Sequence, residues 1–181
     1  MTKKEVTTVL MYGSSHLIPL PGWPNGITKF QAFLAIKPLL KNRLYWYALQ
    51  LAYTASDNLF DYKADVFKAF SADHTERDHL MNARERNYLN RLPDEITIYR
   101  GMTKSELDSG NFGISWTLNR ERAEFFAKTY ARNYATDKYE KVVHALTIKK
   151  QDVIAYFAGR KEFEIIYLNK GYIVRPGLKF N

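Results

Sequence analysis

The spacing of hydrophobic residues in the first half of the chain predicts helices. Up to about residue 93 of 181, apolar residues recur three and four positions apart, which is the period of an amphipathic helix. The helices expected from this period lie at about 27–36, 38–55, 58–70 and 75–90. Pro38 suits the first turn of the second helix, and Thr75 is a good N-cap for the fourth. Residues 6–12 have instead the composition of a short strand.

From residue 94 onward the hydrophobic pattern is typical of strands. Apolar residues alternate with polar ones or form short runs bounded by turn residues. The expected strands are 95–100, 112–116, 141–149, 152–157, 162–168 and 171–175. One helix interrupts them; Asn119 can cap it, and its apolar stripe consists of Ala123, Phe126, Ala127 and Tyr130. Helices first and strands second favour an α+β protein over a doubly wound parallel sheet.

Composition is that of a globular protein. Apolar residues make up 46% and aromatic residues 15%, so we expect one domain over 1–181, with a mainly helical lobe at 1–93 and a mainly β portion at 94–181. Cysteine is absent, which excludes thiolate metal sites, disulfides and a cysteine nucleophile. The histidines lack the spacing of metal ligands, so no metal site is expected. The proline-containing segment 13–26 predicts an ordered loop or arm.

The charge pattern bears on partners and location. A net charge of +8 favours acidic ligands or partners. The positive charge is scattered through mixed-sign helices, however, which argues against specific nucleic-acid binding. No apolar run approaches the roughly 20 residues of a membrane span, and the N-terminal residues are not those of a signal peptide. We therefore expect a monomeric cytoplasmic protein that does not attach to a membrane.

Three of the expected strands carry polar residues where a buried strand would carry apolar ones. In the first of them, Arg100 shares a face with Ile96 and Ile98 and is followed by Gly101. An arginine in this position can offer its planar donor fork to phosphates or carboxylates, and a glycine lets a ligand approach the backbone. The alternative is a surface arginine at the end of a strand.

The second stretch, 113–117, has two small hydroxyl residues on one face of its expected strand. Ser115 and Thr117 lie on that face, and Trp116 lies on the other. The two hydroxyls could hydrogen-bond a carboxylate on a neighbouring strand and hold it in place. The same composition is nevertheless common in ordinary strands, so this stretch carries weight only beside the other two.

The third stretch carries two carboxylates. Glu162 and Glu164 lie two positions apart, so both point to one face of the expected strand 162–168. Such a pair at the entrance to an apolar run indicates acid–base or cation-stabilising chemistry. The alternative is a solvated strand edge, in which Arg160 and Lys161 form salt bridges with the two carboxylates.

Taken in order, the three stretches resemble a known set of motifs. Tyr-Arg-Gly at 99–101, Ser-x-Thr at 115–117 and Glu-x-Glu at 162–164 resemble the motifs of the arginine-serine-glutamate class of mono-ADP-ribosyltransferases from bacterial toxins and phages. The resemblance covers residues 95–175. It implies an ADP-ribosyltransferase-like split β-sandwich with one inserted helix and a helical lobe before it. It also implies NAD as cosubstrate, a target protein as partner and a substrate-recognition loop at 156–160.

The resemblance implies a role for each motif residue. Glu164 would stabilise the positive charge that develops on the ribose as nicotinamide leaves, and Ser115 would orient Glu164. Arg100 would hold the pyrophosphate or ribose side of NAD. Glu162 would polarise the incoming group, which points to arginine as the acceptor, because an arginine side chain has a pKa above about 12 and needs a base. The other NAD-binding residues implied are Gly101, Thr117, Phe126 and, in reserve, Tyr130.

The function expected from the sequence is therefore NAD-dependent mono-ADP-ribosylation of a protein arginine. Two alternatives stay open. The first is NAD hydrolysis, because water reaches any open site of this kind. The second is a basic, non-catalytic binding protein in which the carboxylate pair is only a charged edge.

Overall fold

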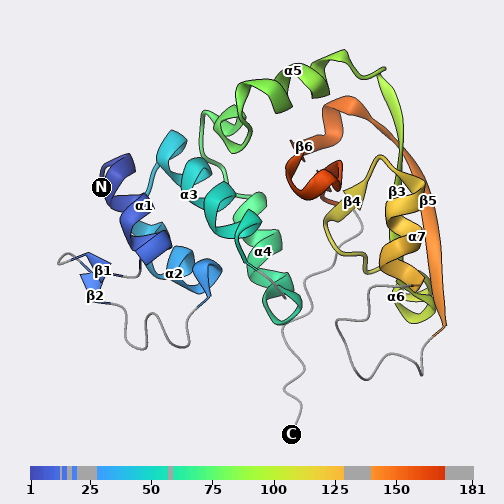
Figure 1. The fold of residues 1–181 in the computed structure, drawn as a ribbon, viewed down its shortest axis with the longest axis horizontal. Helices are drawn as coiled ribbons and strands as arrows, with labels where there is room; N and C mark the ends of the chain where they lie inside the picture. Colours follow the sequence, from blue (N-terminus) through green and yellow to red (C-terminus); the bar gives the residue numbers. More distant parts are fainter. Residues whose placement is uncertain (13, 16–17, 20–27, 57–58, 129–139, 170–181) are drawn as a thin grey trace, which may run out of the picture. The chain divides into compact units, whose positions relative to one another are not determined.

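The computed structural model describes residues 1–12, 14–15, 18–19, 28–56, 59–128 and 140–169 (Figure 1). The chain divides into two compact units, Met1–Asn82 and Ala83–Asn181. Among the described residues the first unit is mainly helical, and the second contains a five-stranded antiparallel sheet. The α+β class predicted from the order of helices and strands is therefore confirmed.

The first unit is organised around one central helix. Both α1 and α2 pack on α3, whose Trp46 and Leu49 are fully buried. The α-helices are α1 (Lys3–Tyr12), α2 (Lys29–Ile36), α3 (Asn42–Thr54) and α4 (Lys63–Phe70). The 3-10 turns are η1 (Lys37–Leu39), η2 (Phe60–Tyr62) and η3 (Arg77–Leu80). Strands β1 (Ser14–Ser15) and β2 (Ile18–Pro19) pair in antiparallel orientation.

The first residues of the chain form a helix, so the strand predicted at 6–12 is wrong. The amide of Thr2 donates to Glu5 Oε2 at 2.7 Å, and the amide of Glu5 donates to Thr2 Oγ1 at 3.3 Å. This reciprocal capping box starts α1, and the bond from Thr2 lowers the pKa of Glu5. Val6, Val9 and Leu10 are then buried on one face at helical spacing, which fits the helix better than a strand.

The helix predicted at 75–90 is also wrong, because the chain turns at Glu76. Glu76 has a left-handed backbone with φ 62°, which a continuous α-helix cannot contain. The indole nitrogen of Trp46 donates to the carbonyl oxygens of His74 and Thr75 at 3.1 and 2.9 Å. The segment therefore forms η3 in the first unit and a separate helix, α5 (Ala83–Arg91), in the second.

The second unit is built on a sheet with the strand order β5-β3-β4-β7-β6, in which every neighbouring pair is antiparallel. Its strands are β3 (Glu95–Thr103), β4 (Ser115–Thr117), β5 (Lys141–Lys149), β6 (Val153–Phe157) and β7 (Glu164–Tyr167). Besides α5, its helices and turns are α6 (Lys104–Ser109), α7 (Arg120–Lys128), η5 (Lys150–Asp152) and η6 (Gly159–Lys161). Helix α7 packs on β3 and β5 (Figure 1).

In the second unit two local predictions are confirmed, and one helix was not predicted. Strand β5 has the predicted bounds, and the predicted cap of α7 is confirmed, because Asn119 Oδ1 accepts from the amide of Arg122 at 3.0 Å. Helix α6 was missed although its ends are marked in the sequence. The amide of Glu106 donates to Thr103 Oγ1 at 3.1 Å, and Gly110 ends the helix with a left-handed φ of 64°.

Some predictions fall on residues outside the described ranges: the strand at 171–175, the first residue of the helix at 58–70, most of the arm at 13–26, and Tyr130. Within the described ranges, no helix combines the length and the apolar character that crossing a membrane requires.

Candidate active site

The three motifs meet at one cavity in the second unit. The three strands that carry the predicted arginine, serine and second glutamate are neighbours in the sheet, in the order β3-β4-β7. With α7 and the residues just before β7 they line an open cavity of about 180 Å³. Its lining residues are Tyr99, Arg100, Gly101, Ser115, Trp116, Thr117, Ala123, Phe126, Glu162 and Glu164. Of the predicted site residues only Tyr130 is not placed here, because it lies outside the described residues.

Ser115 and Glu164 are joined across the pair of strands β4 and β7. In the register of this pair Thr117 lies opposite Glu164, so Ser115, Thr117 and Glu164 share one face. The Ser115 hydroxyl donates to Glu164 Oε1 at 2.5 Å. Glu164 is only 8% exposed, and a buried carboxylate needs such a donor. The hydrogen bond fixes the orientation of the carboxylate at the wall of the cavity.

Glu162 also lines the cavity, but not from a strand. Strand β7 begins at Glu164, and the Glu162 backbone is helical, with φ −90° and ψ −15°. The prediction that the two glutamates share a strand face is therefore wrong, because side chains alternate only along extended backbone. Lys161 and Phe163, on either side of Glu162, are left-handed, with φ of 55° and 50°.

Three consecutive carbonyl groups hold this turn against the end of β4, the residue that follows it and the first turn of α7. The carbonyl of Lys161 accepts from Nε of Arg122 at 3.2 Å. The carbonyl of Glu162 accepts from the Thr117 hydroxyl at 2.6 Å, and that of Phe163 accepts from the amide of Leu118 at 3.1 Å. Left-handed non-glycine residues cost roughly 1–3 kcal/mol each, so such a turn persists only where contacts of this kind hold it.

Arg100 is held in place by a residue that sequence reasoning missed. Its Nε donates to Glu106 Oε1 at 2.9 Å, and its Nη1 donates to the carbonyl of Ser115 at 2.7 Å. Glu106 Oε1 also accepts from the amide of Gly113 at 2.8 Å. The Thr103-x-x-Glu106 pattern could have revealed α6 and its first turn, but not the contact with Arg100, which depends on how α6 packs.

Two glycines near Arg100 are required by close packing. A Cβ on Gly113 would lie 2.4 Å from Nη2 of Arg100, so the glycine makes room for the guanidinium. A Cβ on Gly101 would lie 2.2 Å from the carbonyl oxygen of Ala123 and 2.7 Å from the amide nitrogen of Ala127. The close backbone approach at Gly101 is therefore made by α7, which brings Phe126 to the cavity.

Helix α5 anchors the start of the turn that leads to the glutamates. Glu85, which is 6% exposed, accepts from the amide of Ala158 at 3.0 Å. Tyr88 of the same helix stacks on Tyr156, with ring centroids 4.5 Å apart. Burial, with the neighbouring Tyr88 and Glu85, raises the pKa of Tyr156 to about 12. Nothing in the local sequence identifies these contacts, because they join residues about 70 positions apart.

Neither the described residues nor a comparison with known proteins points to a metal or another ligand. Within the described ranges, no group of three or more histidine, aspartate or glutamate side chains is placed to hold a metal ion. No family model, curated protein or solved structure matches the chain. The residues at the cavity are therefore the features of the molecule that indicate a function.

Proposed function

We propose that this protein is a NAD-dependent mono-ADP-ribosyltransferase that modifies an arginine of a target protein. The observation that carries the proposal is the convergence of Arg100, Ser115 and Glu164 from three neighbouring strands on one cavity, with Glu162 beside them. These are the residue types and the chain order of the arginine-serine-glutamate motifs. We also infer that the sheet of the second unit belongs to an ADP-ribosyltransferase-like split β-sandwich.

The size of the cavity favours binding of one end of NAD. A cavity of about 180 Å³ is smaller than the roughly 300–1,000 Å³ that encloses a drug-sized molecule, so the nicotinamide riboside end would enter while the remainder stays outside. Among the described residues, Arg100 Nη2 has no hydrogen-bond partner, whereas Nε and Nη1 are both engaged. This amino group is therefore available for an anionic oxygen of the pyrophosphate.

The carboxylates have separate tasks in the proposed reaction. Glu164, oriented by Ser115, stabilises the positive charge at the ribose C1′ carbon as its bond to the nicotinamide nitrogen breaks and the bonding electrons leave with nicotinamide. A guanidinium nitrogen of the target arginine then forms the new bond to C1′. Glu162 accepts the proton that this nitrogen loses. The left-handed turn around Glu162 fits this role, because strained backbone is concentrated at functional sites.

Two glutamine variants test the proposal. Purified protein is incubated with NAD labelled on its adenylate phosphate and with a cell lysate, and released nicotinamide and labelled protein are measured separately. We expect Glu164→Gln to lose both activities by about 10²–10³-fold, because the amide keeps the shape but not the charge. We expect Glu162→Gln to lose transfer to arginine and to keep NAD hydrolysis, because water needs no guanidinium base.

The control is Glu121→Gln, which removes the same charge from an exposed position on α7. It should leave both activities unchanged. Mass spectrometry should place ADP-ribose on arginine. Wild-type protein that releases nicotinamide without labelling protein would be a NAD hydrolase, and one that does neither would be a binding protein. Either result contradicts the proposed transfer, as does modification mapped to another residue type.

A further inference from the structure

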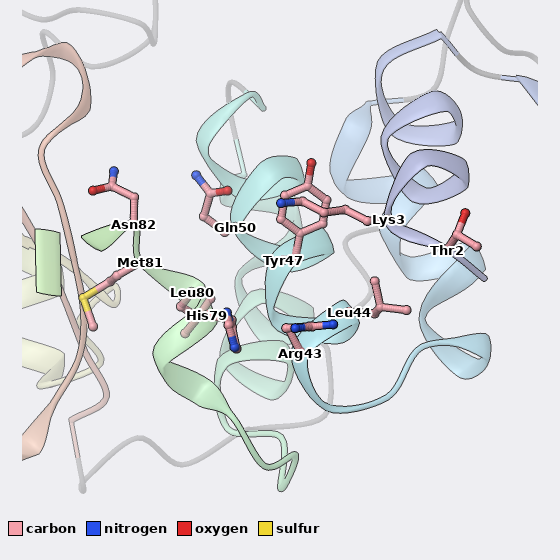
Figure 2. A pocket seen from close by; sticks show the side chains of 10 residues that line it. All are labelled: Thr2, Lys3, Arg43, Leu44, Tyr47, Gln50, His79, Leu80, Met81 and Asn82. Carbon is pink, nitrogen blue, oxygen red and sulfur yellow. The ribbon is translucent and has the colours of Figure 1, made fainter. Parts of the chain in front are cut away.

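The first unit contains a second and larger cavity, which the proposed function does not use. Its volume is about 590 Å³, against about 180 Å³ at the candidate active site. Cavities of roughly 300–1,000 Å³ are typical of small-molecule sites. All of its lining residues belong to Met1–Asn82, so the site is complete within one unit (Figure 2).

Three segments form the walls of this cavity. Helix α3 contributes Arg43, Tyr47 and Gln50, which lie four and three positions apart and so form one stripe of the helix. The start of α1 contributes Lys3, whose side chain reaches across the Tyr47 ring (Figure 2). The third wall is formed by 79–82, at the end of η3 and after it.

The walls carry positive charge, and no carboxylate is among the lining residues. Among the described residues, neither Lys3 nor Arg43 has an acidic partner. Two carboxylates contact lining residues other than these cations: Glu5 accepts from the amide of Thr2, and Glu76 Oε1 lies 3.8 Å from His79 Nε2. The two long cations at the cavity are therefore free to neutralise an anion.

The Lys3 ammonium, on an exposed residue, lies against the ring of Tyr47. Its Nζ lies 4.4 Å from the centroid of the Tyr47 ring, a cation–π contact. The Tyr47 hydroxyl lies 2.8 Å from the Thr7 hydroxyl, and the latter also donates to the Lys3 carbonyl at 2.9 Å. A cation that is already ordered loses less conformational entropy when it binds an anion.

The end of α3 adds to the positive potential around Arg43. The N-cap residue, Lys41, makes no side-chain hydrogen bond to the first turn of the helix, and Arg43 lies in that turn. Arg43 therefore lies near the positive end of the helix dipole. Beside these polar groups, Leu44, Leu80 and Met81 give the cavity an apolar part.

We propose that this cavity binds a small organic anion, in which a phosphate or carboxylate contacts Lys3 and Arg43 and an apolar, ring-sized body lies against Leu80. The proposal does not depend on the proposed transferase activity, because no residue of the candidate active site takes part in it.

Phenyl phosphate is the probe for a direct test, with benzoate and phenol as comparisons. Calorimetry of the full chain should show binding of phenyl phosphate that weakens as salt is added, because screening reduces attraction between charges. Benzoate distinguishes a carboxylate site from a phosphate site, and both outcomes support an anion site. Phenol, which has the ring without the charge at neutral pH, should bind at least about tenfold more weakly. Equal binding of phenol would overturn the proposal.

Matched variants locate the binding site. Lys3→Gln and Arg43→Gln should each weaken phenyl phosphate binding at least about tenfold, since each removes a charged hydrogen-bond donor. Lys4→Gln and Lys41→Gln remove the same charge from exposed neighbours that do not line the cavity, and should bind as the parent does.

Hydrogen exchange provides an independent readout of the same site. Bound phenyl phosphate should slow exchange at 43–50 and 79–82, which contain the lining residues of two of the walls. Absence of binding by the parent protein would overturn the proposal. The same conclusion would follow if the control variants lost as much affinity as Lys3→Gln and Arg43→Gln, or if protection appeared only elsewhere in the chain.

Discussion

The Ser115 hydroxyl donates to Glu164 Oε1 at 2.5 Å, and this bond joins neighbouring strands through two residues that are 49 positions apart in the sequence. Glu164 is 8% exposed, so this bond both satisfies and orients a buried carboxylate. The geometry assigns different tasks to the two hydroxyls of the Ser-x-Thr motif. Ser115 holds the side chain of Glu164, whereas Thr117 holds the backbone of Glu162.

Removal of the serine hydroxyl should reduce both proposed activities. Ser115→Ala leaves Glu164 in place but free to rotate, and misplacement of a catalytic group by about 1 Å can cost about 10²-fold in rate. We expect kcat for NAD hydrolysis and for arginine transfer to fall together by roughly 10-fold to 100-fold. Ser105→Ala, at an exposed position on α6, is the control. Unchanged kcat in Ser115→Ala would remove the hydroxyl from the proposed mechanism.

Loosening the turn around Glu162 should affect transfer more than hydrolysis. Thr117→Val keeps the shape of the side chain and removes the donor to the Glu162 carbonyl. The change also removes the acceptor of the Asn119 amide, and each lost hydrogen bond costs about 0.5–1.5 kcal/mol, so the melting temperature should fall modestly. The ratio of labelled arginine to free nicotinamide should fall as well. Thr97→Val, at an exposed position on β3, should leave the ratio as it is, and a parallel loss of both activities would contradict the separate role of Glu162.

Arg100 and Glu106 should act as one unit in binding NAD. Arg100→Lys should weaken NAD binding at least about tenfold, because a point charge cannot reproduce a planar fork. Glu106→Ala should weaken it too, since it leaves Nε of Arg100 and the amide of Gly113 without their acceptor. In a double-mutant cycle measured by calorimetry, the two losses should be less than additive. Strict additivity would show that Glu106 acts independently of Arg100.

A methyl group at Gly101 should destabilise the second unit. Its Cβ would lie 2.2 Å from the carbonyl oxygen of Ala123, so α7 must move away from β3. Overpacking usually costs about 1–3 kcal/mol, and a clash with helix backbone should reach at least the upper end of that range. Gly159→Ala is the control, because a Cβ there meets nothing within 4 Å. Equal melting temperatures for the two variants would contradict the packing role of Gly101.

Two buried tyrosines should make the protein sensitive to alkali. Burial raises the pKa of Tyr45 and of Tyr156 to about 12, from about 10 in an unfolded chain. Between these values the unfolded chain loses protons that the folded protein keeps, so the free energy of unfolding should fall as pH rises from 10 to 12 and should not depend on these groups below pH 10. Urea unfolding of Tyr45→Phe and Tyr156→Phe should show a shallower fall than the parent protein. Parallel curves would exclude both tyrosines as the cause.

The sequence by itself determined those features that depend on local spacing. The period of apolar residues located α2 and α3, alternation located β5, and Asn119 marked the start of α7. The wrong prediction at 6–12 also had a local cause, because the capping box of Thr2 and Glu5 can be read from the sequence. The residue types of the three motifs and their order pointed to the cavity, since neighbouring strands carry them.

Tertiary structure alone decided how those residues are held. The left-handed backbone on either side of Glu162 depends on donors from Thr117, Leu118 and Arg122, which lie about 40 positions earlier. The contact between Glu106 and Arg100 depends on how α6 packs. The cavity of the first unit likewise joins residues from α1, α3 and 79–82. The periodicity of apolar residues indicates which face of a helix or strand is buried. It does not indicate which distant residue packs against that face, so only the folded chain shows these contacts.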